Sequence, residues 1–154
     1  MRPVLALCLL ASPALAESPR EALFPGDEGC YRRDYDAGHL ATHPDQLVRE
    51  IRLSPDKAVL DARYLVLKVQ VRLRGSDDEL LANAYCENTG GSLSCGLEGD
   101  AGWLTLEPTA RGLRASVGRD GIGFETDTGF VTLGGGQSDD TVFAIPRASA
   151  EACQ

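Results

Sequence analysis

Residues 86–95, CENTGGSLSC, place two adjacent glycines midway between two cysteines. Gly90 and Gly91 suit the central positions of a two-residue hairpin turn, where φ is positive. Counting outward from this turn pairs Cys86 with Cys95 at a non-hydrogen-bonded position, where the Cα atoms of antiparallel strands come closest. That separation lies at the short end of the range for disulfides. The sequence therefore predicts a disulfide-bridged hairpin.

The N-terminal residues are typical of a signal peptide that is removed on export. Basic Arg2 precedes an apolar run over residues 4–10, and an Ala-x-Ala pattern ends at Ala16. We therefore expect residues 1–16 to be a leader, and residues 17–154 to form a single disulfide-stapled β domain in the periplasm or outside the cell.

The cysteines outside the leader form an even set, as expected for an exported protein. Once Cys86 and Cys95 are paired, Cys30 and Cys153 remain, and we expect them to tie the start of the domain to its end. Four thiols holding a metal are the alternative. The chain has no Cys-x-x-Cys pattern, and an exported protein meets an oxidising compartment, so disulfides are favoured.

Alternating apolar and polar residues predict an all-β fold. The strongest alternation runs from Arg63 to Arg74, and Asp120-Gly121 predicts a hairpin turn between two later strands. Further strands are predicted over residues 47–53, 80–86, 93–97, 103–107, 113–117, 122–126, 130–133 and 141–145. We expect a small antiparallel meander of eight or nine strands, closed as a barrel rather than packed as a sandwich. A short helix is predicted over residues 36–43, capped by Asp36.

The charge of the chain excludes some partners. With 15 Lys and Arg against 23 Asp and Glu, the formal net charge is −8. An acidic protein repels nucleic acid and favours basic partners or cations. No apolar segment approaches the ~20 residues that span a bilayer. We expect a monomer that binds an envelope protein or a small molecule.

The two histidines are the weak candidates for a metal site. His39 and His43 are four residues apart and would share one face of a helix, with Asp36 or Asp45 as a third ligand. The alternative is a pair of exposed histidines on a polar turn, and this is favoured because the His-Glu-x-x-His pattern is missing. We therefore predict neither a metal nor another cofactor.

No catalytic residues are predicted. The chain has no Gly-x-Ser-x-Gly pattern, and the cysteines of the domain are assigned to disulfides. The segment that follows Cys30 holds the weak candidates for an interface, because tyrosine and arginine are enriched at binding hot spots. These candidates are Tyr31, Arg32, Arg33 and Tyr35. Packing of an N-terminal segment onto the sheet is the favoured alternative.

The layout resembles that of small exported bacterial all-β proteins. The resemblance rests on the leader, the Cys-Tyr-Arg-Arg run at residues 30–33, the disulfide hairpin and the strand-rich remainder. Size, acidity and disulfide use are also similar to those of exported lysozyme-inhibitor barrels, whose contact motif is missing here. The resemblance implies a fold and no activity.

Three functional hypotheses follow. The first is a non-enzymatic exported binding module, such as an envelope protein–protein interaction domain or an inhibitor-like domain. The second is a lipocalin-like carrier of a small apolar ligand inside the barrel. The third is a hydrolase with clustered carboxylates, one of which would have a raised pKa.

Overall fold

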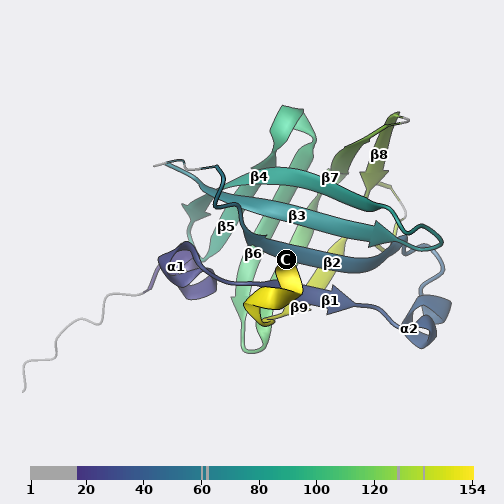
Figure 1. Ribbon diagram of the computed structural model, residues 1–154, viewed down its shortest axis with the longest axis horizontal. Helices are drawn as coiled ribbons and strands as arrows, with labels where there is room; N and C mark the ends of the chain where they lie inside the picture. The colour runs from purple at the N-terminus through teal and green to yellow at the C-terminus, as the bar shows by residue number, and fades with distance from the viewer. Residues whose placement is uncertain (1–16, 60, 62, 128, 137) are drawn as a thin grey trace, which may run out of the picture.

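A computed structural model of the 154-residue chain describes residues 17–59, 61, 63–127, 129–136 and 138–154. The predicted leader, residues 1–16, lies outside this part. Figure 1 shows antiparallel strands curving into a barrel, with short helices beside them. The strands in the described part of the chain are β1 Tyr31–Asp34, β2 Val48–Pro55, β3 Leu65–Leu73, β4 Glu79–Thr89, β5 Ser92–Leu97, β6 Gly102–Thr109, β7 Gly112–Thr126, β8 Gly129–Leu133 and β9 Val142–Pro146.

Short helical segments flank the strands. They are the α-helices α1 Pro19–Leu23 and α2 Ala37–Thr42, and the 3₁₀ turns η1 Pro25–Asp27, η2 Glu98–Asp100 and η3 Ala150–Cys153. The prediction of a helix capped by Asp36 is confirmed, because the Asp36 carboxylate accepts a hydrogen bond from the His39 backbone N–H. Helix α1 was not predicted, because it is only five residues long.

The barrel is a closed eight-strand antiparallel meander with one extra strand outside it, as the sequence predicts. Strands β1 to β7 pair in chain order, and β9 pairs with the first half of β7. A single bridge between Tyr31 and Arg147 then joins the β9 end to β1. The extra strand β8 pairs with the second half of β7.

The hairpin register is confirmed. Cys86 lies opposite Cys95, and their Cα atoms are 4.0 Å apart in the disulfide. The second disulfide joins Cys30 to Cys153. One detail differs, because Gly90 has a positive φ of 59° and Gly91 does not. Two disulfides fit a protein of an oxidising compartment.

The prediction of a hairpin turn at Asp120-Gly121 is wrong. Residues 112–126 form one continuous strand, and the four residues from Gly118 to Gly121 bulge where β7 leaves β6 and turns toward β8. Gly121 has φ +82°, and a Cβ there would lie 2.5 Å from the Leu133 carbonyl oxygen. Glycine is therefore required for the bend, which the Asp-Gly signal alone cannot distinguish from a turn.

The inward-facing side chains pack into one hydrophobic core. It includes residues of the barrel strands and, from the N-terminal segment, Leu23 and Phe24, which close one end. Among the largest fully buried side chains are Tyr31, Phe124, Phe143, Leu67, Leu93, Leu104 and Leu106. The strong alternation of residues 65–71 is thus explained by burial of its odd positions.

The two disulfides are expected to contribute unequally to stability. In the chain-entropy model the cross-link of 123 residues between Cys30 and Cys153 is worth about 5 kcal/mol, and that of nine residues between Cys86 and Cys95 about 2.5 kcal/mol. Replacement of each pair by serine should lower the free energy of unfolding in that order. Urea denaturation of the two double variants measures this, and an equal or reversed order would contradict it.

Candidate functional site

The N-terminal interface candidates do not form one surface. Tyr31 is fully buried: its hydroxyl donates a hydrogen bond to the Leu23 carbonyl at 2.7 Å, and it accepts one from Arg147. Burial raises its pKa, and the bond from Arg147 opposes this rise. Tyr31 therefore serves the core rather than a partner.

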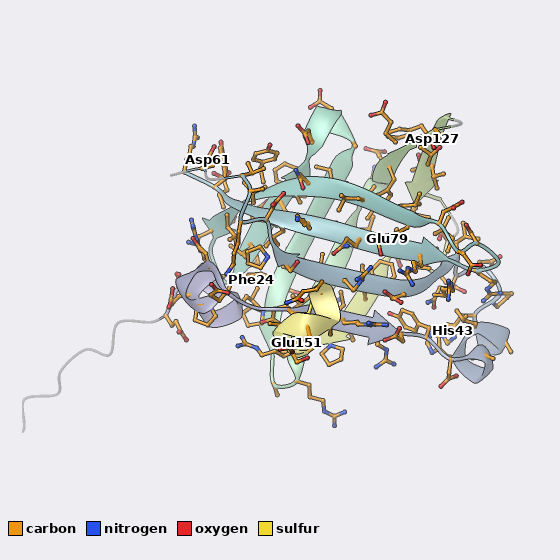
Figure 2. The ribbon with its side chains drawn as sticks, viewed as in Figure 1. Phe24, His43, Asp61, Glu79, Asp127 and Glu151 are labelled. Carbon is orange, nitrogen blue, oxygen red and sulfur yellow. A yellow bond between two sulfur atoms is a disulfide. The ribbon has the colours of Figure 1, made fainter. Side chains whose placement is uncertain are left out.

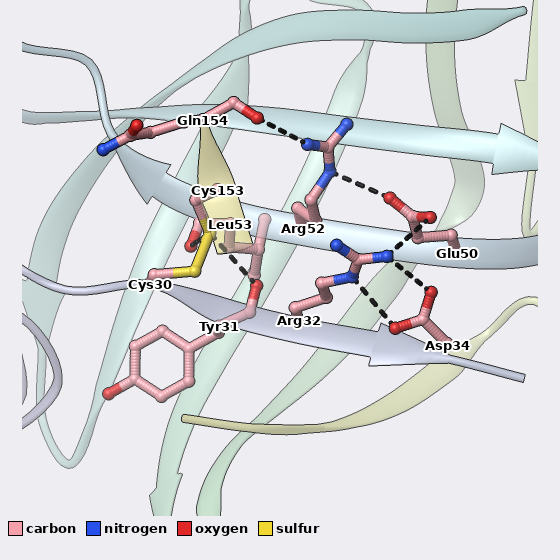
Figure 3. The surroundings of a disulfide bond; sticks show 9 residues. All are labelled: Cys30, Tyr31, Arg32, Asp34, Glu50, Arg52, Leu53, Cys153 and Gln154. Carbon is pink, nitrogen blue, oxygen red and sulfur yellow. Dashed lines mark hydrogen bonds and ion pairs between the residues drawn. A yellow bond between two sulfur atoms is a disulfide. The ribbon is translucent and has the colours of Figure 1, made fainter. Parts of the chain in front are cut away.

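Arg32 lies on the outer face of the sheet in a network of ion pairs (Figure 3). Its guanidinium makes two hydrogen bonds with Asp34 at 2.9 Å and contacts Glu50 at 3.2 Å. The bond from Arg32 lowers the pKa of Asp34. Glu50 also lies 3.0 Å from the nearly buried Arg52, which contacts the terminal residue Gln154. The charged groups of this network pair with one another, so the Arg32 guanidinium serves the fold rather than a partner.

Arg33 and Tyr35 instead join the two histidines in a continuous stack. The Arg33 guanidinium lies 5.2 Å from the centre of the Tyr35 ring, and Tyr35 lies 4.7 Å from the His39 ring. The His39 and His43 rings stack at 4.1 Å and are nearly parallel, 13° apart. Figure 2 labels His43 beside α2, away from Asp127 at the tip of the β7–β8 hairpin. Burial raises the pKa of Tyr35.

Hydrogen bonds assign the tautomers of both histidines. The Gln46 side-chain NH₂ donates to the Val48 carbonyl, so its oxygen accepts from Nε2 of His39 at 2.9 Å. Nδ1 of His43 donates to the His39 carbonyl at 2.9 Å. Among the described residues no group of three or more His, Cys, Asp or Glu could hold a metal ion. Held by these hydrogen bonds, the His39 and His43 rings form part of the wall of a pocket.

That pocket, of about 340 Å³, lies between β1, α2 and β9. We call it the arginine–histidine pocket. Besides the stack, its lining includes Gln46, Asp139 and Thr141. It opens where β1 and β9 diverge from their single bridge at Tyr31 and Arg147.

Asp140 fixes the loop beneath this pocket. The carboxylate is fully buried and accepts hydrogen bonds from the backbone N–H groups of Leu47 at 2.7 Å and Val48 at 3.1 Å. Burial raises its pKa, and these bonds oppose the rise. Among the carboxylates of the described residues this one matches the raised pKa that the hydrolase hypothesis requires. Its oxygens are, however, committed to the backbone.

A second hollow lies between β4 and the β7–β8 hairpin. Strand β5 pairs with β4 only as far as Ala84, so residues 79–83 pair with no described strand on that edge. Turn η2 forms the floor, where the Gly123 N–H donates to the Ala101 carbonyl at 2.6 Å. The resulting groove has a volume of about 550 Å³. We call it the β4–β7 groove.

Two apolar side chains stand on the walls of the β4–β7 groove. Leu81 of β4 is 51% exposed and Phe130 of β8 is 61% exposed, the highest values among the large apolar residues described. The Phe130 ring lies over Gly123, where a Cβ would come within 2.0 Å of it. Both side chains thus face solvent beside the groove rather than the core.

Acidic side chains surround these apolar walls. Glu98 and Glu125 line the groove, and an adjoining hollow of about 540 Å³ shares Glu125 and adds Asp78, Glu79 and Asp127. Glu79 is neutralised by Arg52 and Arg72. No lysine or arginine lines either hollow, and Glu98, Glu125 and Asp127 make no ion pair within the described part of the chain.

The β4–β7 groove was missed by the sequence reasoning, although a signal existed. Residues 130–133 alternate so that Val131 and Leu133 face inward, which leaves Phe130 pointing outward. Leu81 likewise stands between Leu80 and Ala82, which share the inward face. A large apolar residue on the outer face of a strand marks a candidate contact.

Comparisons of the chain with protein-family models, with curated proteins and with solved structures gave no match. Within the described residues, no helix has the length and apolar character needed to cross a membrane. Function is therefore inferred from the geometry of the chain itself.

Replacing Asp140 is expected to destabilise the fold. Asp140→Ala leaves two backbone N–H groups without an acceptor and should lower the free energy of unfolding by about 2–4 kcal/mol. Asp140→Asn, which keeps one acceptor oxygen, should cost less. The variants are compared by urea denaturation.

Comparison of the natural protein with Asp140→Asn also predicts a pH dependence of the free energy of unfolding. A carboxyl with a raised pKa in the folded state contributes most below the unfolded pKa of about 3.9, and this contribution is lost as pH rises through the raised value. Relative to Asp140→Asn, the natural protein should therefore lose stability as pH rises through that range. A gain in stability would contradict burial as the dominant cause.

Proposed function

We propose that this protein is a non-enzymatic exported binding module whose β4–β7 groove docks a cationic, partly apolar segment of an envelope protein. The observation that carries the proposal is the pair Leu81 and Phe130, exposed on facing walls of one groove. Burial of such side chains under a partner supplies most of the affinity of a typical contact.

The charge of the groove specifies the chemistry of the partner. Glu98, Glu125 and Asp127 lie beside the apolar walls and form no ion pair with any described residue. Lysine or arginine on the partner would pair with them, and the formal net charge of −8 would speed its approach. A neutral or acidic segment would gain only the apolar part of the contact.

The size of the groove fits a short segment rather than a whole protein face. A volume of about 550 Å³ accommodates a few side chains, comparable to a small-molecule site. The unpartnered edge at residues 79–83 lies along the same groove. A partner segment in an extended conformation therefore suits the length and the chemistry of the groove better than a helix does.

The two alternative functions have less support. A lipocalin-like carrier would need space inside the barrel, whereas the inward side chains form a packed core cluster. A hydrolase would need a carboxylate that is free to act, and the buried Asp140 is bonded to Leu47 and Val48. The groove contains no histidine or cysteine among its lining residues.

The proposal is tested with a phage-displayed library of random twelve-residue peptides selected on the immobilised full chain. Selected peptides should combine lysine or arginine with apolar residues. The double variant Leu81→Ser/Phe130→Ser should bind them at least about tenfold more weakly, as expected for hot-spot residues. Leu47→Ser is the matched control, because Leu47 is similarly exposed outside the groove. It should leave the affinity unchanged.

Charge is tested separately. Glu98→Gln/Glu125→Gln should weaken binding and reduce its dependence on salt, because exposed charges are screened within about 8 Å at physiological ionic strength. Glu87→Gln, an exposed position on the hairpin, is the control. The proposal fails if no peptide is enriched, or if the double variant of Leu81 and Phe130 keeps full affinity.

A further inference from the structure

We propose that the arginine–histidine pocket binds a small oxyanion, a carboxylate or phosphate group, through Arg33. This site lies between β1, α2 and β9 and is separate from the β4–β7 groove in the residues that line it. It also differs in character, since its lining includes Arg33, a cation that forms no ion pair with any described residue.

Arg33 is distinguished by its missing partner. Four other arginines are comparably half-buried, and each of them contacts a carboxylate: Arg20, Arg32, Arg49 and Arg72. Arg33 makes no ion pair with any described residue, and its buried Nε has no hydrogen-bond partner there. A half-buried guanidinium without an ion-pair partner favours the binding of an anion, because a paired charge is far less costly to bury than an unpaired one.

The stack holds the guanidinium in place without using its donors. Contact with the face of Tyr35 stabilises the cation through the ring quadrupole and leaves its N–H groups free. Tyr35 is in turn held by His39, and His39 by its bond to the buried Gln46. The planar fork of arginine matches the two oxygens of a carboxylate or phosphate. Little further ordering is needed on binding.

His43 stands at the far end of the stack, with the Tyr35 and His39 rings between it and Arg33. Its Nδ1 hydrogen is donated to the His39 carbonyl, so in this tautomer Nε2 is an acceptor and makes no bond with an oxyanion. Thr141 adds a hydroxyl to the lining. A volume of about 340 Å³ leaves room for a ligand larger than the anionic group itself.

Asp139 limits the affinity of the site. It is the carboxylate that lines this pocket, and it repels an anion held by Arg33. We therefore expect binding to be weak in the natural protein and stronger when this charge is removed. For a cationic ligand, removal of the Asp139 charge should instead weaken binding. A variant of Asp139 therefore distinguishes an anion site from a cation site.

The test is an NMR titration of the ¹⁵N-labelled full chain at pH 6. Sodium acetate and inorganic phosphate are added in separate arms, each against sodium chloride at the same ionic strength. Saturable shifts of the Arg33 side chain and the histidine rings are expected with one or both anions. An effect of acetate alone identifies a carboxylate site, and an effect of phosphate alone identifies a phosphate site.

Variants assign the shifts to the pocket. Arg33→Gln should lower anion affinity at least about tenfold, and Asp139→Asn should raise it about two- to fivefold. Arg111→Gln removes the same charge from an exposed turn and should leave affinity unchanged. Since Asp139 is exposed, its variant tests the site even if Arg33→Gln fails to fold. Absence of saturable shifts, or unchanged affinity in Arg33→Gln or Asp139→Asn, overturns the proposal.

Discussion

The seam between β1 and β9 is the constraint on which the rest of the barrel depends. One bridge, Tyr31 to Arg147, is the only strand pairing described there, and the Ala148 N–H adds a bond to the Cys30 carbonyl at 2.8 Å. A seam with so few ladder bonds relies on other contacts. The Cys30–Cys153 disulfide and the bonds from Arg147 to Leu23 and Tyr31 supply them. They hold β1 in place, and β1 carries Arg33.

The long strand β7 determines the shape of the β4–β7 groove, much as the β1–β9 seam determines that of the arginine–histidine pocket. Its bulge from Gly118 to Gly121 lets one strand pair with three neighbours, with β6 and β9 along its first half and with β8 along its second half. Since β5 ends and β6 begins at η2, no described strand pairs with both the far half of β7 and the start of β4. The groove thus results from a difference in strand length and from a bend that only glycine permits at residue 121.

Sequence alone predicted the fold better than the sites. Alternation, the glycine pair and the even cysteine count are local signals, and they correctly predicted strands, hairpin register and barrel class. Strand β1 was missed because it is four residues long. Tyr31, an interface candidate for which packing onto the sheet was the favoured alternative, enters the core. The Arg33–Tyr35–His39–His43 stack depends on how β1 leads into α2, and the groove depends on residues about 45 positions apart in the chain, such as Leu81 and Glu125. No local sequence pattern predicts which of these residues meet in the folded protein.

Both hollows lie where strand pairing stops, and this follows from the way a small barrel fills its interior. An eight-strand barrel has little more volume than its own inward side chains occupy, and the described inward side chains form one packed core cluster. Where neighbouring strands diverge, side chains no longer meet across the gap and backbone edges lose their partners. The lack of an ion pair at Arg33 and the exposure of Leu81, both within the described part of the chain, follow from those gaps. Ligand-binding chemistry in this fold is therefore expected in its wall, at the β1–β9 seam and beside β4, rather than within the barrel.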